Sequence, residues 1–360
     1  MLVRDFDFDL PAELIAQEPA ADRGGARLLY LPRRSGAVAH STIAALPTWL
    51  HAGDVLVVNN TRVFPARLLG HRVPSGGAVE CLLVARLDTA TGVVSSGFSV
   101  PAERWEALVH PGQKLKPGSR VVFRGAVTLN GEILERRFFG RRTVRLWTDD
   151  GTPVQQAVET IGHVPLPPYI KREDRGSDRE RYQTVFARTS GSIAAPTAGL
   201  HFSAALLAAL RERGVVVTEI TLHVGYGTFQ PVRVEQVEDH RVEPERYEIS
   251  SEAAGAINQA RDQGRRVIAV GTTTTRTLES VGRANEGRIV AGGGSTDLFI
   301  YPGFQFTVIS GLLTNFHLPQ SSLLMLVCAF AGRERVLAAY REAVQERYRF
   351  YSYGDAMLIL

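Results

Sequence analysis

Residues 55–62 read Val55-Leu56-Val57-Val58-Asn59-Asn60-Thr61-Arg62. An unbroken aliphatic run of this kind is typical of a strand buried on both faces. Polar side chains gathered where such a strand ends are typical of binding crevices in α/β proteins. The alternative interpretation is an Asn-rich turn without a ligand. The stretch therefore favours an α/β fold and makes Asn59, Asn60, Thr61 and Arg62 candidate binding residues.

The segment from Pro65 to Asp150 has a different pattern. Short β-rich runs alternate with breaks such as Pro117-Gly118 and Asn130-Gly131, and no convincing helix interrupts them. This spacing favours a small sandwich or barrel. The predicted runs are 66–69, 80–84, 105–109, 120–123, 126–129 and 143–147.

The β-rich segment is also basic, with five arginines close together: Arg136, Arg137, Arg141, Arg142 and Arg145. A solvated surface is the default explanation for such charge. An arginine ridge on a barrel can also hold nucleic-acid phosphates, and the sequence leaves both interpretations open.

From residue 151 onward, strand and helix patterns alternate, which indicates an α/β domain. Before the β-rich segment, we expect a helix at 10–16 and a strand at 27–31. After it, we expect strands at 215–222, 266–270 and 298–301, and helices at 252–263, 321–330, 333–348 and from 277. Both ends of the chain look α/β and the middle does not. We therefore expect a discontinuous α/β domain, residues 1–64 and 151–360, that carries an inserted β-barrel domain, residues 65–150.

A Pro/Gly turn precedes one predicted helix, in the stretch Ala195-Pro196-Thr197-Ala198-Gly199-Leu200-His201-Phe202. Ser203 and an Ala/Leu-rich run follow, as at a helix start. Exposed N–H groups there favour anionic ligands and would lower the pKa of His201. The alternative is a capped loop in which His201 only satisfies the turn. Thr197, Gly199 and Phe202 are candidate binding residues here.

Similar polar loops adjoin other predicted strands and helices, at 225–229, 271–276 and 314–317. In an open α/β sheet, the strand C-termini gather such loops into one crevice. Glycines let backbone approach a ligand, threonines and helix N-termini donate hydrogen bonds, and aromatic rings such as Phe202, Tyr226, Phe229 and Phe316 could stack on a flat base. The candidate binding residues in these loops are Gly225, Gly227, Thr228, Phe229, Gly271, Thr272, Thr273, Arg276 and Asn315.

The candidate proton carriers near these loops are His201, His223, Asp239, His240 and His317. A lone histidine or aspartate is more often structural, so each stays a hypothesis. The sequence has no P-loop, GxGxxG, HExxH or GxSxG motif, which argues against the corresponding enzyme classes.

Charge, cysteine content and the length of the apolar runs limit the partners and the compartment that we expect for the protein. The 360 residues carry a formal charge of +4, which is weakly compatible with a polyanionic partner. Cys81 and Cys328 form no CxxC or zinc pattern, and this favours a reducing compartment. The apolar run 323–331 is too short to span a bilayer. We expect a cytoplasmic monomer with no membrane association.

Taken together, the motifs resemble those of the S-adenosylmethionine:tRNA ribosyltransferase-isomerases of queuosine biosynthesis. The resemblance runs nearly end to end, over 5–8, 14–17, 59–63, 65–68, 105–109, 165–170, 195–202, 223–229, 231–232, 271–273, 276–279, 292–297, 312–319 and 352–357.

The resemblance implies an α/β domain with an inserted barrel. It also implies transfer of the ribosyl part of S-adenosylmethionine (SAM) to 7-aminomethyl-7-deazaguanine (preQ1) at the tRNA wobble position. The sugar rearranges to an epoxycyclopentane, and adenine and methionine leave. SAM is then a substrate, and no permanently bound cofactor and no metal is expected. His201, Asp239, His240 and His317 are the implied catalytic candidates; His201 is slightly favoured as base, with Asp239-His240 as the competing pair.

Three departures from the family pattern stand out. Glu243 occupies the place of a second histidine after Asp239-His240, Tyr226 is bulkier than usual, and Thr274-Thr275 replaces a Ser and an apolar residue. The stretch 88–103 looks like an enlarged barrel loop. The rival interpretations are a non-catalytic RNA-binding protein and a SAM-dependent RNA methyltransferase.

Overall fold

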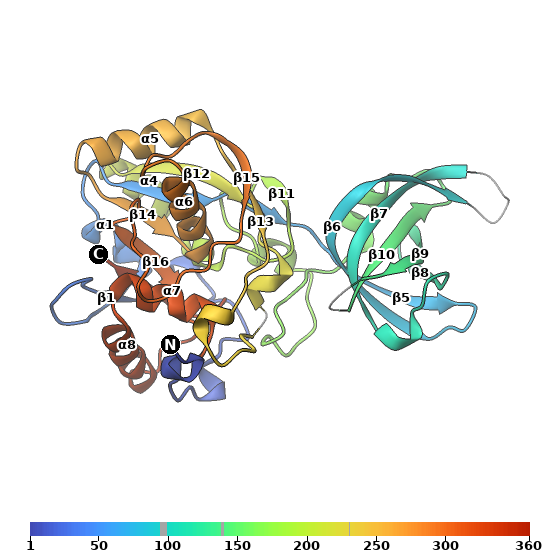
Figure 1. Cartoon of the computed structure of the whole chain (residues 1–360), viewed down its shortest axis with the longest axis horizontal. Helices are drawn as coiled ribbons and strands as arrows, with labels where there is room; N and C mark the ends of the chain where they lie inside the picture. The colour runs from blue at the N-terminus through green and yellow to red at the C-terminus, as the bar shows by residue number, and fades with distance from the viewer. Residues whose placement is uncertain (94–98, 138–139, 230) are drawn as a thin grey trace. The chain divides into compact units, whose positions relative to one another are not determined.

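The computed structural model describes residues 1–93, 99–137, 140–229 and 231–360, apart from the side chains of 90–93, 99 and 229 (Figure 1). The chain forms two compact units. The first comprises Met1–Arg62, Pro167–Arg172 and Arg181–Leu360, and the second comprises Val63–Leu166 and Glu173–Glu180. The first is α/β and the second contains a closed barrel, so the predicted fold class is confirmed.

A nine-stranded sheet forms the centre of the α/β unit, in the order β15-β13-β12-β3-β14-β16-β17-β1-β2. Its middle consists of the mutually parallel strands β12 (Val216–Leu222), β3 (Val55–Asn59), β14 (Val267–Val270) and β16 (Gly311–Asn315). Their carboxyl ends therefore lie at the same edge. The flanking strands are β15 (Gly292–Thr296), β13 (Glu245–Ile249), β17 (Ala356–Ile359), β1 (Arg27–Leu31) and β2 (Ala39–Thr42). A separate pair joins β4 (Thr61–Val63) to β11 (Thr189–Ser192).

Helices cover both faces of the sheet. Successive residues of β3 alternate between the two cores: Val55 and Val57 face one, and Leu56 and Val58 face the other. This alternation is the strand period of two, and it explains why the whole run is apolar. The first core includes α5 (Ser251–Asp262), α6 (Thr272–Ala284), α7 (Ser322–Ala331) and α8 (Arg333–Gln345), and the second includes α1 (Leu46–Trp49) and α4 (Ala204–Glu212).

Several predicted boundaries can be compared with the structure. Ser203 caps α4 by accepting a backbone N–H group, as predicted, and Ser250 caps α5 in the same way. The helix after β14 begins at Thr272 rather than 277, because Gly271 with a φ of 90° turns the chain directly into it. The predicted strand at 298–301 and helix at 10–16 are wrong: the first is irregular and the second is only a 3-10 turn, Ala12–Leu14.

The second unit is a barrel closed in the order β10-β7-β6-β5-β8-β9. Its strands are β5 (Arg67–Val73), β6 (Ala78–Val93), β7 (Ser99–His110), β8 (Arg120–Arg124), β9 (Thr128–Arg136) and β10 (Arg141–Thr148). Most of the supposed loop 88–103 is instead the paired end of a long hairpin, with Asp88 opposite Arg104; residues 94–98 lie outside the described residues. The following helix, α2 (Val154–Ile161), packs on β9 and β10, so this unit extends beyond residue 150.

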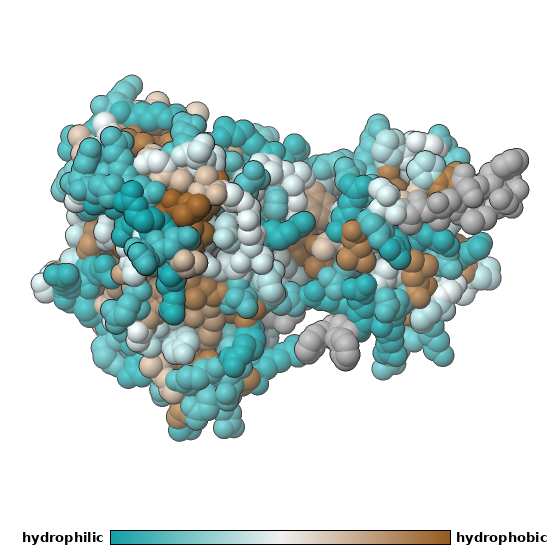
Figure 2. All heavy atoms as spheres, turned by 45° about the horizontal axis from the view of Figure 1, so that its top comes forward, coloured by the Kyte–Doolittle hydropathy of each residue, from teal (hydrophilic) through white to brown (hydrophobic). Residues whose placement is uncertain are grey.

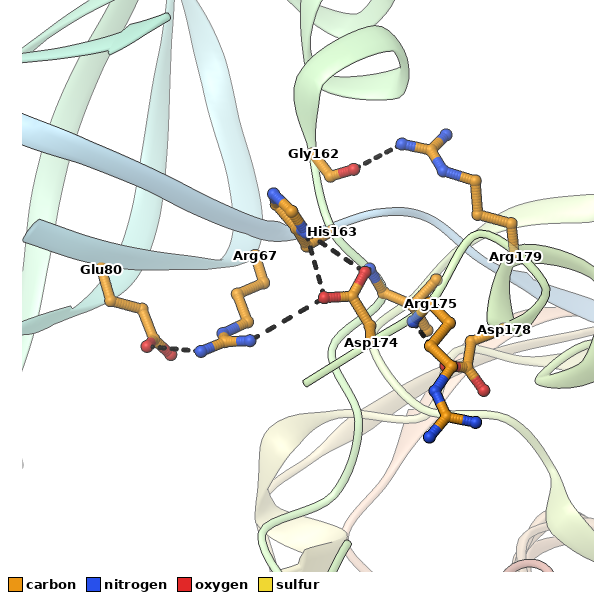
Figure 3. A network of polar contacts seen from close by, with 9 residues as sticks. Arg67, Glu80, Gly162, His163, Asp174, Arg175, Asp178 and Arg179 are labelled. Atoms are coloured by element: carbon orange, nitrogen blue, oxygen red, sulfur yellow. Dashed lines mark hydrogen bonds and ion pairs between the residues drawn. The ribbon is translucent and has the colours of Figure 1, made fainter. Parts of the chain in front are cut away.

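A polar network fastens the segment Glu173–Glu180 to the barrel unit. Asp174 lies between Arg67 and His163 in Figure 3: its carboxylate is 3.0 Å from His163 Nδ1 and 4.0 Å from an Arg67 nitrogen. Arg67 also pairs with Glu80 at 2.9 Å. The short helix α3 (Asp178–Arg181) follows, and Asp178 accepts the Arg175 N–H at 2.8 Å.

The arginine cluster of the barrel is not a uniform cationic ridge. Arg142 is 2% exposed, and its guanidinium donates to the carbonyls of Gly112, Leu115, Gly140 and Arg141. Arg141 pairs with Glu106 at 3.1 Å, and Arg145 pairs with Glu132. Local carboxylates and carbonyls therefore already engage these three cations.

The molecular surface is mainly hydrophilic on the face that Figure 2 shows, with apolar patches between polar ones. Within the described ranges, no helix is both long and apolar enough to cross a membrane.

Candidate active site

One cleft of the α/β unit lies at the carboxyl ends of β12, β14 and β16. We call it cleft A; it holds about 490 Å³ of space that opens to solvent. Its walls are Ala195, Pro196, Thr197, Ala198, Val224, Thr228, Gly271, Thr272, Thr273, Thr314, Asn315, His317, Leu323, Tyr351 and Ser352. The polar loops of four segments far apart in sequence thus converge here, as expected for an open α/β sheet.

The N-terminus of α6 lines cleft A and offers hydrogen-bond donors to a ligand. No side chain of the described residues caps this helix, so its first-turn N–H groups and the positive end of its dipole are available to an anion. Thr273 lies in that turn, and its hydroxyl is buried with no partner among the described residues. A buried hydroxyl without a partner is costly, so this position favours a hydrogen-bonding ligand.

Asn315, at the end of β16, supplies a hydrogen-bond acceptor. Its Nδ2 donates to the Tyr351 carbonyl at 3.0 Å, and this fixes the amide orientation because a carbonyl only accepts. The other amide atom, Oδ1, is buried and has no donor within the described part of the chain. Cleft A therefore presents donors at α6 and an acceptor at Asn315, a combination that suits a carboxylate together with an ammonium group.

A second cavity, cleft B, adjoins cleft A and shares Thr228 and Leu323 with it. It holds about 510 Å³, open to solvent, and its walls are Gly227, Thr228, His240, Arg241, Val242, Glu243, Arg276, Leu298, Phe299, Ile300, Ser322, Leu323 and Leu326. The His240 and Phe299 rings meet edge to face with centroids 4.9 Å apart. Mixed apolar, aromatic and charged walls are typical of a site for a flat polar ligand.

Arg276, one of the walls of cleft B, belongs to a buried ion pair. Arg276 Nη1 is 2.8 Å from Glu245 Oε2, and the two side chains are 6% and 4% exposed. Glu245 Oε1 accepts from the Gly225 N–H and the Thr228 hydroxyl, both at 2.9 Å. Arg276 Nε donates to the Leu298 carbonyl, and this network therefore joins α6, β13 and the loops at 225–228 and 298. Arg276 Nη2 is buried without an acceptor in residues 1–93, 99–137, 140–229 and 231–360.

His201 does not line cleft A. It lines a smaller cavity with Arg23, Arg181 and Ser352. Its Nε2 lies 3.2 Å from Asn315 Nδ2, which is a donor, so this ring nitrogen accepts and the ring proton is on Nδ1. Burial lowers the pKa of His201 to about 4. The histidine is neutral as predicted, but burial rather than a helix dipole is the main cause.

The other predicted proton carriers also lie at different places in the structure. His317 lines cleft A, is 2.9 Å from the Thr314 hydroxyl through Nε2, and has its pKa lowered to about 3 by burial. His240 lines cleft B, and burial followed by Arg241 lowers its pKa. Asp239 is exposed, and no hydrogen bond or ion pair joins it to His240 in the described ranges. The supposed Asp239-His240 pair is therefore not formed. His223 contacts Thr61 through Nδ1 at 3.0 Å.

The buried histidines predict a loss of stability in acid. Between pH 6.5 and about 4 the unfolded chain protonates His201 and His317 while the folded chain does not, so the free energy of unfolding falls as the pH falls, by about 1.4 kcal/mol per pH unit for each histidine. His317→Gln is expected to make this slope shallower by about one such increment. Urea unfolding from pH 6 to pH 4.5 measures it. Replacing the exposed His51 by glutamine is the control, and an unchanged slope in His317→Gln would contradict the prediction.

The polar residues after β3 hold the scaffold together rather than line either cleft. Asn59 donates to the Leu222 carbonyl and accepts the Leu222 and Thr61 N–H groups, which ties β3 to β12. Asn60 bonds to Glu219 and Thr221, and Thr61 bonds to Ser192. Arg62 is exposed.

Several other predicted binding residues have roles in packing or in hydrogen bonding within the protein. Phe202 and Phe316 are fully buried in the two cores, so the expectation that they stack on a ligand is corrected. Gly199 is needed for close packing, because a Cβ there would lie 2.8 Å from Phe186 and Thr184. The Gly225 N–H donates to the Glu245 carboxylate, and Gly227 lines cleft B. Phe229 ends a 3-10 turn, but its side chain lies outside the described part.

The clefts also contain residues that the sequence analysis did not name as site candidates. Tyr351 and Ser352 line cleft A, Phe299 lines cleft B, and Leu323 lines both. Ser352 falls in one of the recognisable motifs, and Leu323 begins the long apolar run, so both carried a weak signal. Glu245 carried none, because its role depends on a partner 31 positions away.

Comparisons with known proteins agree with this architecture. Residues 3–359 match the family described as "Queuosine biosynthesis protein". The S-adenosylmethionine:tRNA ribosyltransferase-isomerases of Desulfitobacterium hafniense and Symbiobacterium thermophilum are each 50% identical to this chain over 360 residues, with 100% of both chains covered. A crystal structure of S-adenosylmethionine tRNA ribosyltransferase from Thermotoga maritima is 36% identical, covers 99% of this chain and 100% of its own, and gives a TM-score of 0.55. The chain therefore belongs to the queuosine biosynthesis protein family.

Proposed function

We propose that this protein transfers and isomerises the ribosyl moiety of SAM onto preQ1 at the tRNA wobble position, giving epoxyqueuosine-tRNA with release of adenine and methionine. The observation that carries the proposal is cleft A, which the first turn of α6 and Asn315 both line: among the described residues, that helix has no side-chain cap and the buried Asn315 Oδ1 has no donor. The relatives named for the same SAM- and tRNA-dependent activity support it.

The amino-acid end of SAM fits these two groups. Its carboxylate would accept from the first-turn N–H groups of α6 and from Thr273, and its ammonium would donate to Asn315 Oδ1. SAM acts here as a substrate, bound and consumed in each turnover. We propose that the protein works as a cytoplasmic monomer.

The chemistry requires a neutral base near C5′ of SAM, since the adjacent sulfonium acidifies that C–H. His317 is neutral and lines cleft A, whereas His201 lines another cavity and its Nε2 already accepts from Asn315. We therefore place the proton-accepting role on His317 and make His201 a positioning residue for Asn315.

Replacing Thr273 with valine is expected to weaken SAM binding without destabilising the folded protein. The buried hydroxyl has no partner in the described chain, so its loss should leave the free energy of unfolding unchanged within about 0.5 kcal/mol or raise it. SAM affinity should fall by about 1–3 kcal/mol through a lost hydrogen bond. Calorimetric titration with SAM measures this. Thr277→Val is the control, since that hydroxyl donates within α6 to the Thr273 carbonyl. Unaltered SAM affinity in Thr273→Val would remove this turn from the site.

The proposed function is tested by product analysis. Adenine is expected only when SAM and a preQ1-bearing anticodon stem-loop are both present. S-adenosylhomocysteine as product would indicate a methyltransferase, and binding of both without turnover would indicate a non-catalytic protein. Single-turnover adenine release should be lost in His317→Ala; loss in His201→Ala with a normal rate in His317→Ala would return the base to His201.

A further inference from the structure

Cleft B has a composition that the SAM site does not explain. The reaction of the proposed function, on which this inference rests, joins two substrates at one point. Cleft A has the donors and the acceptor that suit the amino-acid end of SAM. Cleft B adjoins it and shares the wall formed by Thr228 and Leu323, so a ligand in each would meet there.

The polar groups of cleft B complement a guanine-type edge. Arg276 Nη2 is a buried donor without an acceptor in the described ranges, on a side chain that is 6% exposed. Glu243 lines the same cavity and lies against Gly227, where a Cβ would come within 3.3 Å of its side-chain carbons. A guanine-type base offers one acceptor, O6, beside two donors, N1–H and the 2-amino group. A guanidinium matches the first, and one carboxylate can accept from both of the others.

The remaining walls suit a flat ring. Phe299 contributes an aromatic ring, and Leu298, Ile300, Leu323 and Leu326 surround it with apolar surface. Bases of single-stranded RNA loops are recognised in this manner, by stacking on aromatic side chains and hydrogen bonding along the Watson–Crick edge. Adenine would use the site less fully, because its edge offers one donor where the guanine edge offers two.

We propose that cleft B binds the 7-deazaguanine base of the wobble nucleotide, with Arg276 donating to O6 and Glu243 accepting from N1–H and the 2-amino group. The aminomethyl group of the base would then project toward cleft A, where it meets SAM. Gly227 suits this arrangement, because a Cβ there would lie 3.3 Å from the side-chain carbons of Glu243, closer than most such contacts.

The test uses Glu243→Gln, which keeps the shape of the side chain and removes one acceptor oxygen. Fluorescence anisotropy with a preQ1-bearing anticodon stem-loop should show binding weaker by about 10- to 100-fold. Calorimetry with SAM alone should show an affinity within about twofold of the wild type, since a change under about 0.4 kcal/mol is not a lost contact. Glu252→Gln, at an exposed position in α5, is the control.

A second stem-loop, whose modified base lacks the 2-amino group, isolates the contact. It should bind the wild type more weakly than the preQ1 stem-loop does, and the two should bind Glu243→Gln nearly equally. Phe299→Leu should also weaken stem-loop binding with SAM affinity unchanged. Weaker SAM binding with normal stem-loop binding in Glu243→Gln would place adenine in cleft B and overturn the proposal, as would equal base discrimination in both proteins. Failure of the wild type to release adenine would instead refute the proposed function.

Discussion

Arg276→Ala is expected to lower single-turnover adenine release by at least about 100-fold and the free energy of unfolding by about 3–5 kcal/mol. The guanidinium is buried against Glu245, and its removal leaves that carboxylate buried without its counter-charge. The Leu298 carbonyl loses its donor as well. Because Glu245 also holds Gly225 and Thr228, the loop between the two clefts loses its anchor.

A matched exposed pair provides the control. Arg288 and Asp262 are 50% and 57% exposed, and Arg288→Ala should change stability by less than about 1 kcal/mol and leave adenine release intact. Adding Glu245→Gln to Arg276→Ala removes the stranded charge, so stability should recover in part while activity does not. An Arg276→Ala protein with normal rate and normal urea midpoint would show that the network has neither role.

Arg142→Ala is expected to destabilise the barrel unit by about 2–4 kcal/mol, because it strips hydrogen-bond donors from carbonyls at Gly112, Leu115, Gly140 and Arg141. Urea unfolding followed by tryptophan fluorescence reports it, since Trp105 and Trp147 lie in barrel strands. The loss concerns folding, so at temperatures where the protein stays folded the affinity for tRNA should be unchanged.

Arg136→Ala is the matched variant. Its side chain is exposed and has no hydrogen bond or ion pair in the part of the chain that the structure describes. Its removal should leave stability unchanged and, where the barrel contacts tRNA, reduce the salt dependence of binding by about one phosphate contact. If Arg142→Ala weakened tRNA binding without affecting the unfolding curve, the buried interpretation of Arg142 would be wrong.

The sequence by itself determined the architecture. The run at 55–58 alternates between two apolar cores, and this requires helices on both faces of the sheet. The change to short β-rich runs after Pro65 marked the inserted barrel. Ser203 identified a helix start because capping is a local interaction of a side chain with the backbone three residues ahead. Patterns of this kind depend on neighbours in sequence, so sequence is sufficient to find them.

Only the tertiary structure decided which polar residues face the clefts. Asn59 and His201 belong to motifs as prominent as Thr273 and Asn315, yet Asn59 joins two strands and His201 lies in another cavity. The five arginines look alike in sequence, and one of them is fully interior. A side chain's function follows from its partner and its direction, and those partners come from strands and helices far away in the chain. Local periodicity reports that a residue is buried, but not what it is buried against.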